Sequence, residues 1–271
     1  MKKPDFFKTV SAAVVGIFAV FSLLFVSGCG DKGEIVVFVG KDTTIQGIEC
    51  VLVKAGTFTM GSPTNESGRD NDEVRRQVTL TQDFYLGKYP ITQAQYQAVM
   101  GNNPSYFSGD SRPVERVNWY DANDFCQAVG GRLPTEAEWE FAARGGNKSN
   151  GYIYSGSNTV GDVAWYWGNS SSGTKPVGQK YPNDIGLYDM SGNVYEWCND
   201  WYGSYPAEAV TNPAGPSTGD YRVLRGGNWR AYPQYCRVAH RGYFSPFGSF
   251  LTIDMFDGGS IIGFRVAFPR N

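Results

Sequence analysis

The 271-residue chain has a formal net charge of −2 and a sequence pI of about 5.5, so no strong basic field attracts nucleic acid or acidic lipid, and we predict no nucleic-acid partner. Aromatic residues make up 15% of the chain and glycine occurs 34 times, which is typical of a loop-rich globular fold and excludes a disordered chain. The single histidine, His240, excludes a metal site of the usual multi-histidine type.

The N-terminal segment has the three-part layout of an export signal. Three lysines among the first eight residues precede an apolar run over residues 10–26, and Ser27-Gly28-Cys29 follows it. A small pair directly before a cysteine resembles a lipobox, so we interpret residues 1–28 as a lipoprotein signal peptide and Cys29 as the lipidated residue. The lipid would anchor the protein to a membrane, extracytoplasmically and on the outer cell surface. The alternative is an uncleaved membrane helix, although the run is short against the roughly 17 to 25 residues that span a bilayer.

The remainder is predicted to be one domain on a tether. We interpret residues 29–44 as the lipid-anchored tether and residues 45–271 as the domain. In chain order, the composition predicts short strands over residues 51–53 and 58–60 and an alternating strand over residues 77–86.

Three helices have recognisable start signals. Thr92 can cap a helix over residues 93–100, and Asn118 can cap one over residues 119–129. Thr135 and Glu138 have the spacing of a capping box, which predicts a helix that continues through Ala143. Beyond Gly146 no helical periodicity remains, so the pattern predicts an α+β fold with a loop-rich C-terminal half.

The cysteines leave two alternatives open. Apart from Cys29, the chain contains Cys50, Cys126, Cys198 and Cys236, none of them spaced as a CxxC pair. We favour four buried, unpaired thiols that pack as small apolar side chains. Two disulfides, in any of three pairings, are the alternative.

Several motifs occur in a fixed order along the chain and together carry a family resemblance. They are Gly56-Thr57-Phe58-Thr59-Met60-Gly61, Tyr89-Pro90-Ile91-Thr92-Gln93, Gly131-Arg132-Leu133-Pro134-Thr135-Glu136, Asn183-Asp184-Ile185-Gly186-Leu187-Tyr188-Asp189-Met190-Ser191-Gly192-Asn193-Val194-Tyr195-Glu196-Trp197, Arg225-Gly226-Gly227 and Gly263-Phe264-Arg265. This series resembles the formylglycine-generating-enzyme (sulfatase-modifying factor) family over nearly all of residues 51–268. The resemblance implies a variant of the C-type lectin fold.

The resemblance also implies metal sites, which fit this chain unequally. A family calcium site corresponds here to Asp189, Gly192, Val194 and Glu196, and a hydrogen-bonded turn with surface carboxylates is the alternative. Members that generate formylglycine bind copper with two cysteines after the Gly-Gly pair. The second of these falls on Cys236 but the first falls on Ala231, so we predict no copper and no catalysis by this chain.

The segment from residue 229 to residue 261 is rich in Tyr, Phe, Ser, Gly and Asp and has no Lys or Glu, a composition typical of recognition loops. An aromatic loop packed on the domain's own core is the alternative. The candidate ligand-binding residues are Ala231, Tyr232, Tyr235, His240, Gly242, Tyr243, Phe244, Ser245, Phe247, Ser249, Phe250, Asp254, Phe256 and Asp257.

These candidates lie in a region of about residues 226–268 that resembles the variable proteins of diversity-generating retroelements, in which adenines of chosen codons are randomised. The resemblance implies a monomeric, surface-displayed binder of an unknown protein or cell-surface ligand, with a diversifiable site on a rigid lectin-type scaffold. The alternatives are a copper-dependent oxidase of the formylglycine-generating type and an envelope maturation factor with one constant partner.

Overall fold

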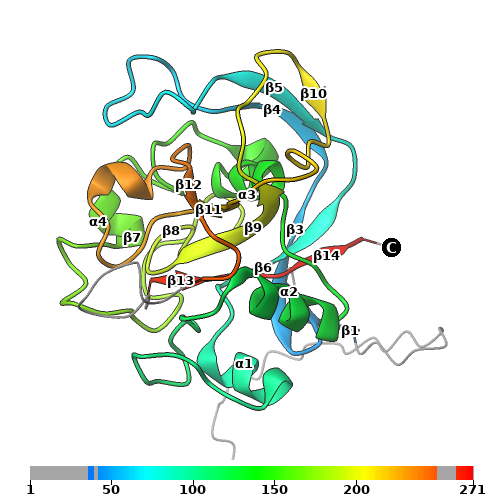
Figure 1. Ribbon diagram of the computed structural model, residues 1–271, viewed down its shortest axis with the longest axis vertical. Helices are drawn as coiled ribbons and strands as arrows, with labels where there is room; N and C mark the ends of the chain where they lie inside the picture. The colour runs from blue at the N-terminus through cyan, green and yellow to red at the C-terminus, as the bar shows by residue number, and fades with distance from the viewer. Residues whose placement is uncertain (1–35, 40–41, 249–260, 271) are drawn as a thin grey trace, which may run out of the picture.

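The computed structural model describes residues 36–39, 42–248 and 261–270 and has an α+β architecture of short strands, few helices and long connections (Figure 1). The prediction over Cys29 and residues 1–35 lies outside the described residues. Among the helices that the structure describes, none is long and apolar enough to cross a membrane.

Strands of the N-terminal half, together with β10 and β14 from later in the chain, form two sheets. A five-stranded sheet has the order β1-β2-β3-β6-β14, and a three-stranded sheet has the order β10-β5-β4. Their strands are β1 (Val36–Val39), β2 (Asp42–Ile45), β3 (Ile48–Val53), β4 (Gly56–Met60), β5 (Arg76–Leu80), β6 (Phe84–Gly87), β10 (Val210–Thr211) and β14 (Ala267–Pro269).

Two sequence-based boundaries are wrong. The segment expected as a tether contains β1 and β2, which pair antiparallel and extend the sheet from β3, so ordered structure begins before residue 45. The single strand expected over residues 77–86 is two strands, β5 and β6, in different sheets. Asp83 lies between them, where its carboxylate accepts a hydrogen bond from the Ala55 backbone at 2.8 Å and pairs with Lys54 at 2.9 Å.

The three predicted helices are confirmed as α1 (Gln93–Met100), α2 (Trp119–Ala128) and α3 (Glu136–Ala143). Each begins with a complete capping box, in which the cap side chain accepts a hydrogen bond from the backbone N–H of the third helical residue, and the side chain of that residue accepts one from the backbone N–H of the cap. The helix starts could be predicted because these bonds join residues only three apart.

The C-terminal half is held by a four-stranded sheet of order β12-β11-β9-β13 and a two-stranded pair, β7 and β8. The strands of these two sheets are β7 (Ala164–Trp165), β8 (Ser191–Gly192), β9 (Tyr195–Trp201), β11 (Arg222–Arg225), β12 (Gly242–Phe244) and β13 (Ile262–Gly263). The helical elements of this half are η1 (Gly146–Lys148), α4 (Val160–Val163) and η2 (Pro233–Cys236). Strand β12 lies within the candidate recognition segment and was not predicted from the sequence.

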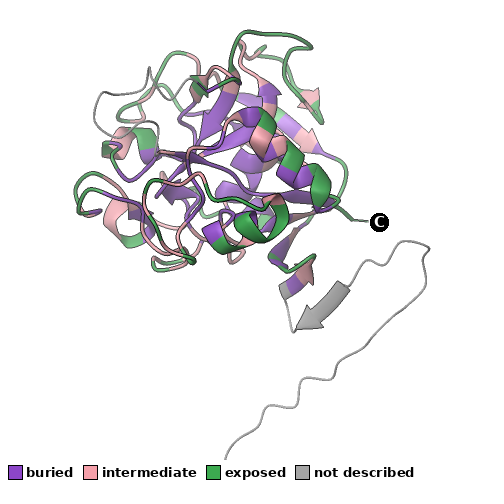
Figure 2. Ribbon diagram, turned by 60° about the horizontal axis from the view of Figure 1, so that its bottom comes forward, coloured by how far each residue is buried: buried purple, intermediate pink, exposed green. Residues whose placement is uncertain are grey.

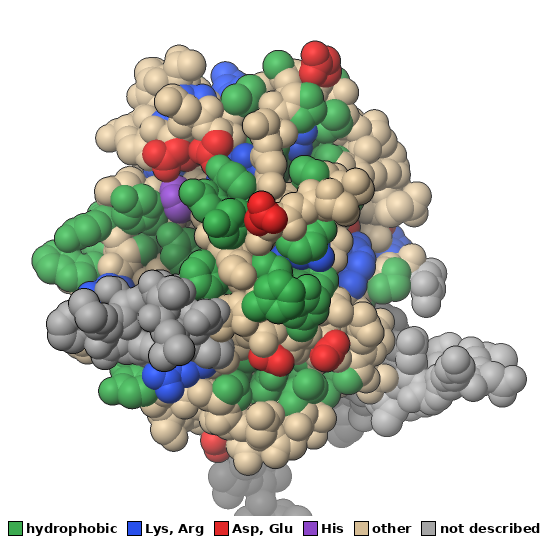
Figure 3. All heavy atoms as spheres, viewed as in Figure 1, with side chains coloured by type: hydrophobic (Ala, Val, Ile, Leu, Met, Phe, Trp, Pro, Cys, Tyr) green, Lys and Arg blue, Asp and Glu red, His purple; other side chains and the backbone are tan. Residues whose placement is uncertain are grey.

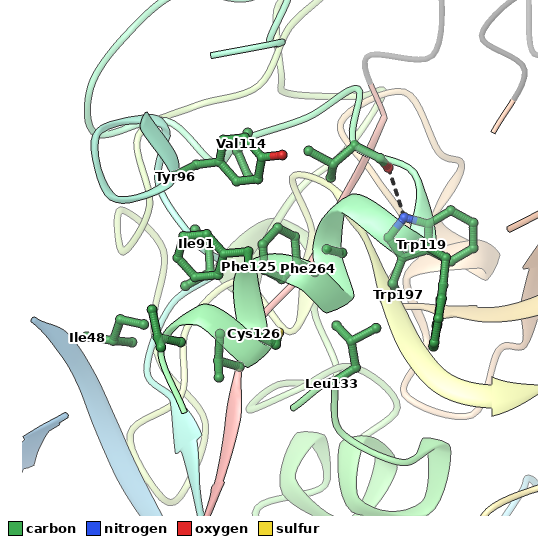
Figure 4. Close-up of a cluster of buried hydrophobic side chains, with 14 of the residues drawn as sticks. Ile48, Ile91, Tyr96, Val114, Trp119, Phe125, Cys126, Leu133, Trp197 and Phe264 are labelled. Atoms are coloured by element: carbon green, nitrogen blue, oxygen red, sulfur yellow. Dashed lines mark hydrogen bonds between the residues drawn. The ribbon is translucent and has the colours of Figure 1, made fainter. Parts of the chain in front are cut away.

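The apolar core has two parts, and buried positions concentrate in the sheets and on the inner faces of the helices (Figure 2). In one part, α1 and α2 pack against the end of the chain, with Tyr96 stacked on Phe125 at 5.6 Å and Phe264 against both (Figure 4). Trp197 joins this part and donates a hydrogen bond to the Val117 carbonyl at 2.9 Å. The other part surrounds α3.

The cysteines that the structure describes, Cys50, Cys126, Cys198 and Cys236, are buried and unpaired, as favoured from the sequence. Burial raises the pKa of Cys50 and Cys236 to about 12, so both remain neutral thiols at physiological pH.

Candidate binding surface

The candidate segment leaves the central strand β11 through two glycines in the left-handed region. Gly226 has φ +90° and Gly227 has φ +75°. A Cβ atom on Gly227 would lie 2.7 Å from the Tyr235 carbonyl oxygen and 2.8 Å from the Cys236 sulfur. Glycine at this position is therefore required both by the backbone conformation and by the close approach of the segment that follows.

Buried arginines fix the backbone beyond these glycines. Arg237 pairs with Glu73 at 2.6 Å and with Glu66 at 2.7 Å, and Arg241 pairs with Glu136 at 2.8 Å. Neither arginine is more than 5% exposed. Each pair joins the segment to a residue more than 100 positions earlier in the chain, so the segment is held by tertiary contacts rather than by local structure.

Strand β11 contributes a third such arginine. Arg225 is fully buried, donates to the carboxylate of Glu140 and to the His240 carbonyl, and lies 3.6 Å from Glu136. Burial alone would raise the pKa of Glu136, but the charges of Arg241 and Arg225 outweigh burial and hold that pKa below its ordinary value. The carboxylate is therefore charged and fully committed to the scaffold.

On either side of Arg237 and Arg241 in the sequence, four aromatic side chains are exposed. We call them the aromatic surface: Tyr232 (53% exposed), Tyr235 (37%), Tyr243 (52%) and Phe247 (72%). Hydrophobic side chains gather around the histidine and across the face that carries β12 (Figure 3). Exposed aromatic side chains of this kind are the ones that dominate binding hot spots.

Aromatic residues from other parts of the chain flank this surface, and the sequence analysis missed them. Trp167 is 63% exposed and packs on Tyr232 with ring centroids 5.6 Å apart. Tyr221 contacts Tyr243 at 5.3 Å, and Tyr120 contacts Phe247 at 5.2 Å. Their place could not be found from spacing, because only the fold brings them to the segment.

Not every candidate residue faces water. Ala231 (7% exposed) and His240 (5% exposed) are buried, so the expectation that they project outward is wrong. Phe244, expected as an exposed anchor, is half-buried and packs against the core near Trp197, because alternate residues of β12 face opposite sides. Gly242 and Ser245 are also half-buried. Ser249, Phe250, Asp254, Phe256 and Asp257 lie outside the described residues.

His240 is held in a state poorly suited to act as a base at neutral pH. Its ring lies between Tyr235, at 5.1 Å, and Tyr195, at 6.4 Å, and Nδ1 has no hydrogen-bond partner. Burial, together with the positive charge of Arg225, lowers its pKa to about 4. The nearest carboxylate, Asp70, lies 3.7 Å from Nε2, beyond hydrogen-bond distance.

The residues at the family copper position do not fit a two-thiolate copper site. Ala231 has no ligand atom, and the buried Cys236 is a neutral thiol because burial raises its pKa to about 12. Copper(I) in the family site is held by two thiolate sulfurs, and with alanine at position 231 this position offers only the one sulfur of Cys236.

The residues proposed for calcium are likewise committed to protein contacts. Both carboxylate oxygens of Glu196 accept hydrogen bonds from Arg265, at 2.6 and 2.7 Å, and one also accepts from Trp139. Asp189 accepts from the Gly178 backbone at 2.7 Å, and burial raises its pKa to about 6. Within the described residues no cluster of three or more His, Cys, Asp or Glu could hold a metal ion. The carboxylates of Asp189 and Glu196 are thus already engaged by protein donors, and a calcium site at Asp189, Gly192, Val194 and Glu196 stays a prediction.

The family model of the sulfatase-modifying factor enzyme 1-like domain matches residues 38–268. The chain belongs to this family. It is similar to the chaperone protein LppX of Paenibacillus barcinonensis, with 36% identity over 256 residues that cover 74% of this chain and 85% of the relative. It is also similar to the formylglycine-generating enzyme of Mus musculus, with 33% identity over 288 residues, 80% of this chain and 74% of the enzyme.

Among solved structures, Treponema denticola variable protein 1 superposes with a TM-score of 0.72 at 31% identity, covering 89% of this chain and 100% of that protein. The predicted fold class, a loop-rich α+β fold of the C-type lectin type in its formylglycine-generating-enzyme variant, is confirmed. Family members thus include enzymes and a variable protein, and this chain resembles both in fold.

Proposed function

We propose that this chain is a ligand-binding protein that recognises a protein or other cell-surface target through its aromatic surface. The observation that carries this proposal is the contrast within one segment: Tyr232, Tyr235, Tyr243 and Phe247 are exposed, whereas Arg237 and Arg241 between them are buried and paired. Aromatic side chains provide a large contact area at a small cost in side-chain entropy.

A rigid frame strengthens such a surface. Because the ion pairs and the Gly226-Gly227 turn already fix the backbone, target binding would not have to order the segment, and that cost would not reduce affinity. The frame would also tolerate changes at the exposed positions, since these side chains contribute little to the core. The similarity to a variable protein agrees with this arrangement.

The remaining parts of the proposal rest on the sequence. We infer a monomeric lipoprotein, anchored through Cys29 and displayed on the outer cell surface, whose exposed C-terminal residues are diversified. Inspection of the coding region tests the last point. A nearby near-copy of the C-terminal coding segment that differs mainly at adenines, with a reverse transcriptase gene beside it, is the expected finding. A genome without such a copy would favour a constant partner.

A display library tests binding directly. Tyr232, Tyr235, Tyr243 and Phe247 are randomised in the full-length chain, and a matched library randomises four exposed positions of α1, namely Ala94, Gln97, Ala98 and Val99. Both libraries are selected against the same panel of unrelated purified proteins. We expect binders to several targets from the first library and few from the second. Equal yields, or loss of protease resistance in the first library, would contradict the proposal.

An oxidase of the formylglycine-generating type is the second candidate, favoured only by the family relationship. The alanine at position 231, where the family site has its first cysteine, argues against it. Copper loading of the purified chain, followed by an assay of cysteine-peptide oxidation, decides between the two. Turnover that Cys236→Ser abolishes would establish the enzyme, and we expect none.

A further inference from the structure

A separate cavity of about 280 Å³ lies beneath the two connections that precede and follow β10. Its roof is formed by residues 203–206 and 213–216, and its floor by Met60, Arg76, Glu136, Asp200 and Arg241. The roof is rich in proline and glycine, so the walls are mostly apolar while the floor carries charge. None of the four residues of the aromatic surface lines it.

Arg76 on the floor lacks the partner expected of a buried guanidinium. It is only 7% exposed, and within the described residues no carboxylate forms an ion pair with it. Its contacts are the Met60 sulfur, 3.8 Å from Nη2, and the face of the Tyr205 ring, 4.0 Å away. Its Nε is buried without a hydrogen-bond acceptor. Burying a charged guanidinium costs free energy unless an anion pairs with it and accepts its hydrogen bonds.

The other charged groups of the cavity are already balanced. Arg241 is paired with Glu136 at 2.8 Å and also donates to the Gly203 carbonyl at 3.0 Å. Asp200 accepts a hydrogen bond from the Glu136 backbone at 2.9 Å, and burial, with the neighbouring charge of Glu136, raises its pKa to about 8. At neutral pH Asp200 is therefore mostly uncharged, and Arg76 leaves one positive charge in excess.

We propose that this cavity binds a small carboxylate with a short apolar body, held by the guanidinium of Arg76. A planar carboxylate matches the two-pronged donor geometry of arginine, and its single charge equals the excess charge of the cavity. A phosphate dianion would bring a second charge that no free cation of the described lining balances. Val210, Pro213 and Pro216 would cover the apolar body, and Tyr205 stacks on the guanidinium from the side. The volume limits the ligand to a few carbon atoms or one ring.

Calorimetric or ligand-observed NMR titration of the full-length chain tests the site with isovalerate, benzoate, isovaleramide and inorganic phosphate as probes. We expect both carboxylates to bind the unmodified chain, and the amide and phosphate to bind at least tenfold more weakly. Arg76→Gln should weaken carboxylate binding at least tenfold, and Arg76→Lys should have an intermediate effect because lysine keeps the charge and loses the fork.

Arg75→Gln is the matched control, because Arg75 is the adjacent residue, carries the same charge and is exposed. It should leave binding unchanged, and the thermal midpoint of each variant shows that it is folded. A second variant, Ala214→Trp, fills the cavity from its roof and should abolish binding without touching Arg76. Absence of carboxylate binding, equal binding by Arg76→Gln, or equal binding of phosphate would each overturn the proposal. None of these results depends on the aromatic surface.

Discussion

The segment that follows β11 contains buried arginines and exposed aromatic residues close together in the sequence. Arg237 and Arg241 are buried and paired with carboxylates from distant parts of the chain, whereas Tyr235 and Tyr243 are exposed beside them. A buried ion pair adds little net stability, but its geometry is demanding, since removing one partner leaves an uncompensated charge. The arginines thus determine where the backbone lies, and the aromatic residues are left to determine what it contacts.

The largest loss of stability is expected when one partner of a buried ion pair is removed. Arg265 is fully buried and pairs with Glu196 at 2.6 Å. Arg265→Met should lower the free energy of unfolding by about 3–5 kcal/mol, because the Glu196 carboxylate remains buried without its cation. Urea denaturation followed by circular dichroism measures the change.

The matched control is Arg265→Met combined with Glu196→Gln, which removes both charges. It should recover part of the lost stability, because no unpaired charge remains. If the double variant is no more stable than the single one, the loss comes from packing rather than from the broken ion pair.

Acidification is expected to destabilise the folded chain through protonation of the buried His240. Its folded-state pKa is about 4, below the ordinary value of 6.5, because of burial and the charges of Arg225 and Arg237, with Glu73 and Asp72 opposing them. The unfolded chain therefore binds the proton more readily, and stability is lost as the pH falls from about 6.5 to about 4, by about 3 kcal/mol at most. His240→Gln should remove this part of the pH dependence, so the difference between the two urea-denaturation profiles isolates the histidine from the carboxylates.

A smaller loss is expected at the turn that begins the segment. Gly227→Ala should cost about 1–3 kcal/mol, because the new Cβ meets the Tyr235 carbonyl and the Cys236 sulfur in a left-handed conformation. Gly130 is the control: its φ is +74°, but a Cβ there meets nothing within 4 Å. Gly130→Ala therefore reports the backbone strain alone, of about 1 kcal/mol. Equal losses in the two variants would mean that the close approach at Gly227 does not matter.

Much of the fold could be predicted because its signals are local or repeated. The cap residues Thr92, Asn118 and Thr135 predicted the starts of the three long helices that the structure describes, since each capping bond closes within one turn. The strands β1 and β2 and the break at Asp83 were missed, because their partners are set by sheet pairing. A single alternating pattern from residue 77 to residue 86 does not show that its two halves enter different sheets.

The binding surface was predicted less completely, for the same reason. Composition indicated a segment rich in exposed aromatic residues, and Tyr232, Tyr235, Tyr243 and Phe247 are exposed, while their role in binding stays a prediction. It could not distinguish His240, which the fold buries between two rings, from its exposed neighbours. Trp167 was missed altogether, because its contact with Tyr232 joins residues far apart in the sequence. Arg76 gave no signal, since the absence of a partner is visible only in three dimensions.

The smallest effects are expected on the aromatic surface itself, and a neighbouring pair makes the test quantitative. Phe247 is 72% exposed, so Phe247→Ser should change the free energy of unfolding by no more than about 0.5 kcal/mol. Phe244 packs against the core near Trp197, so Phe244→Ser should cost about 2 kcal/mol, roughly half of what a fully buried phenylalanine loses. Urea denaturation of both variants measures the difference. If Phe247→Ser destabilises the chain as much as Phe244→Ser does, Phe247 belongs to the core and the surface loses its most exposed member.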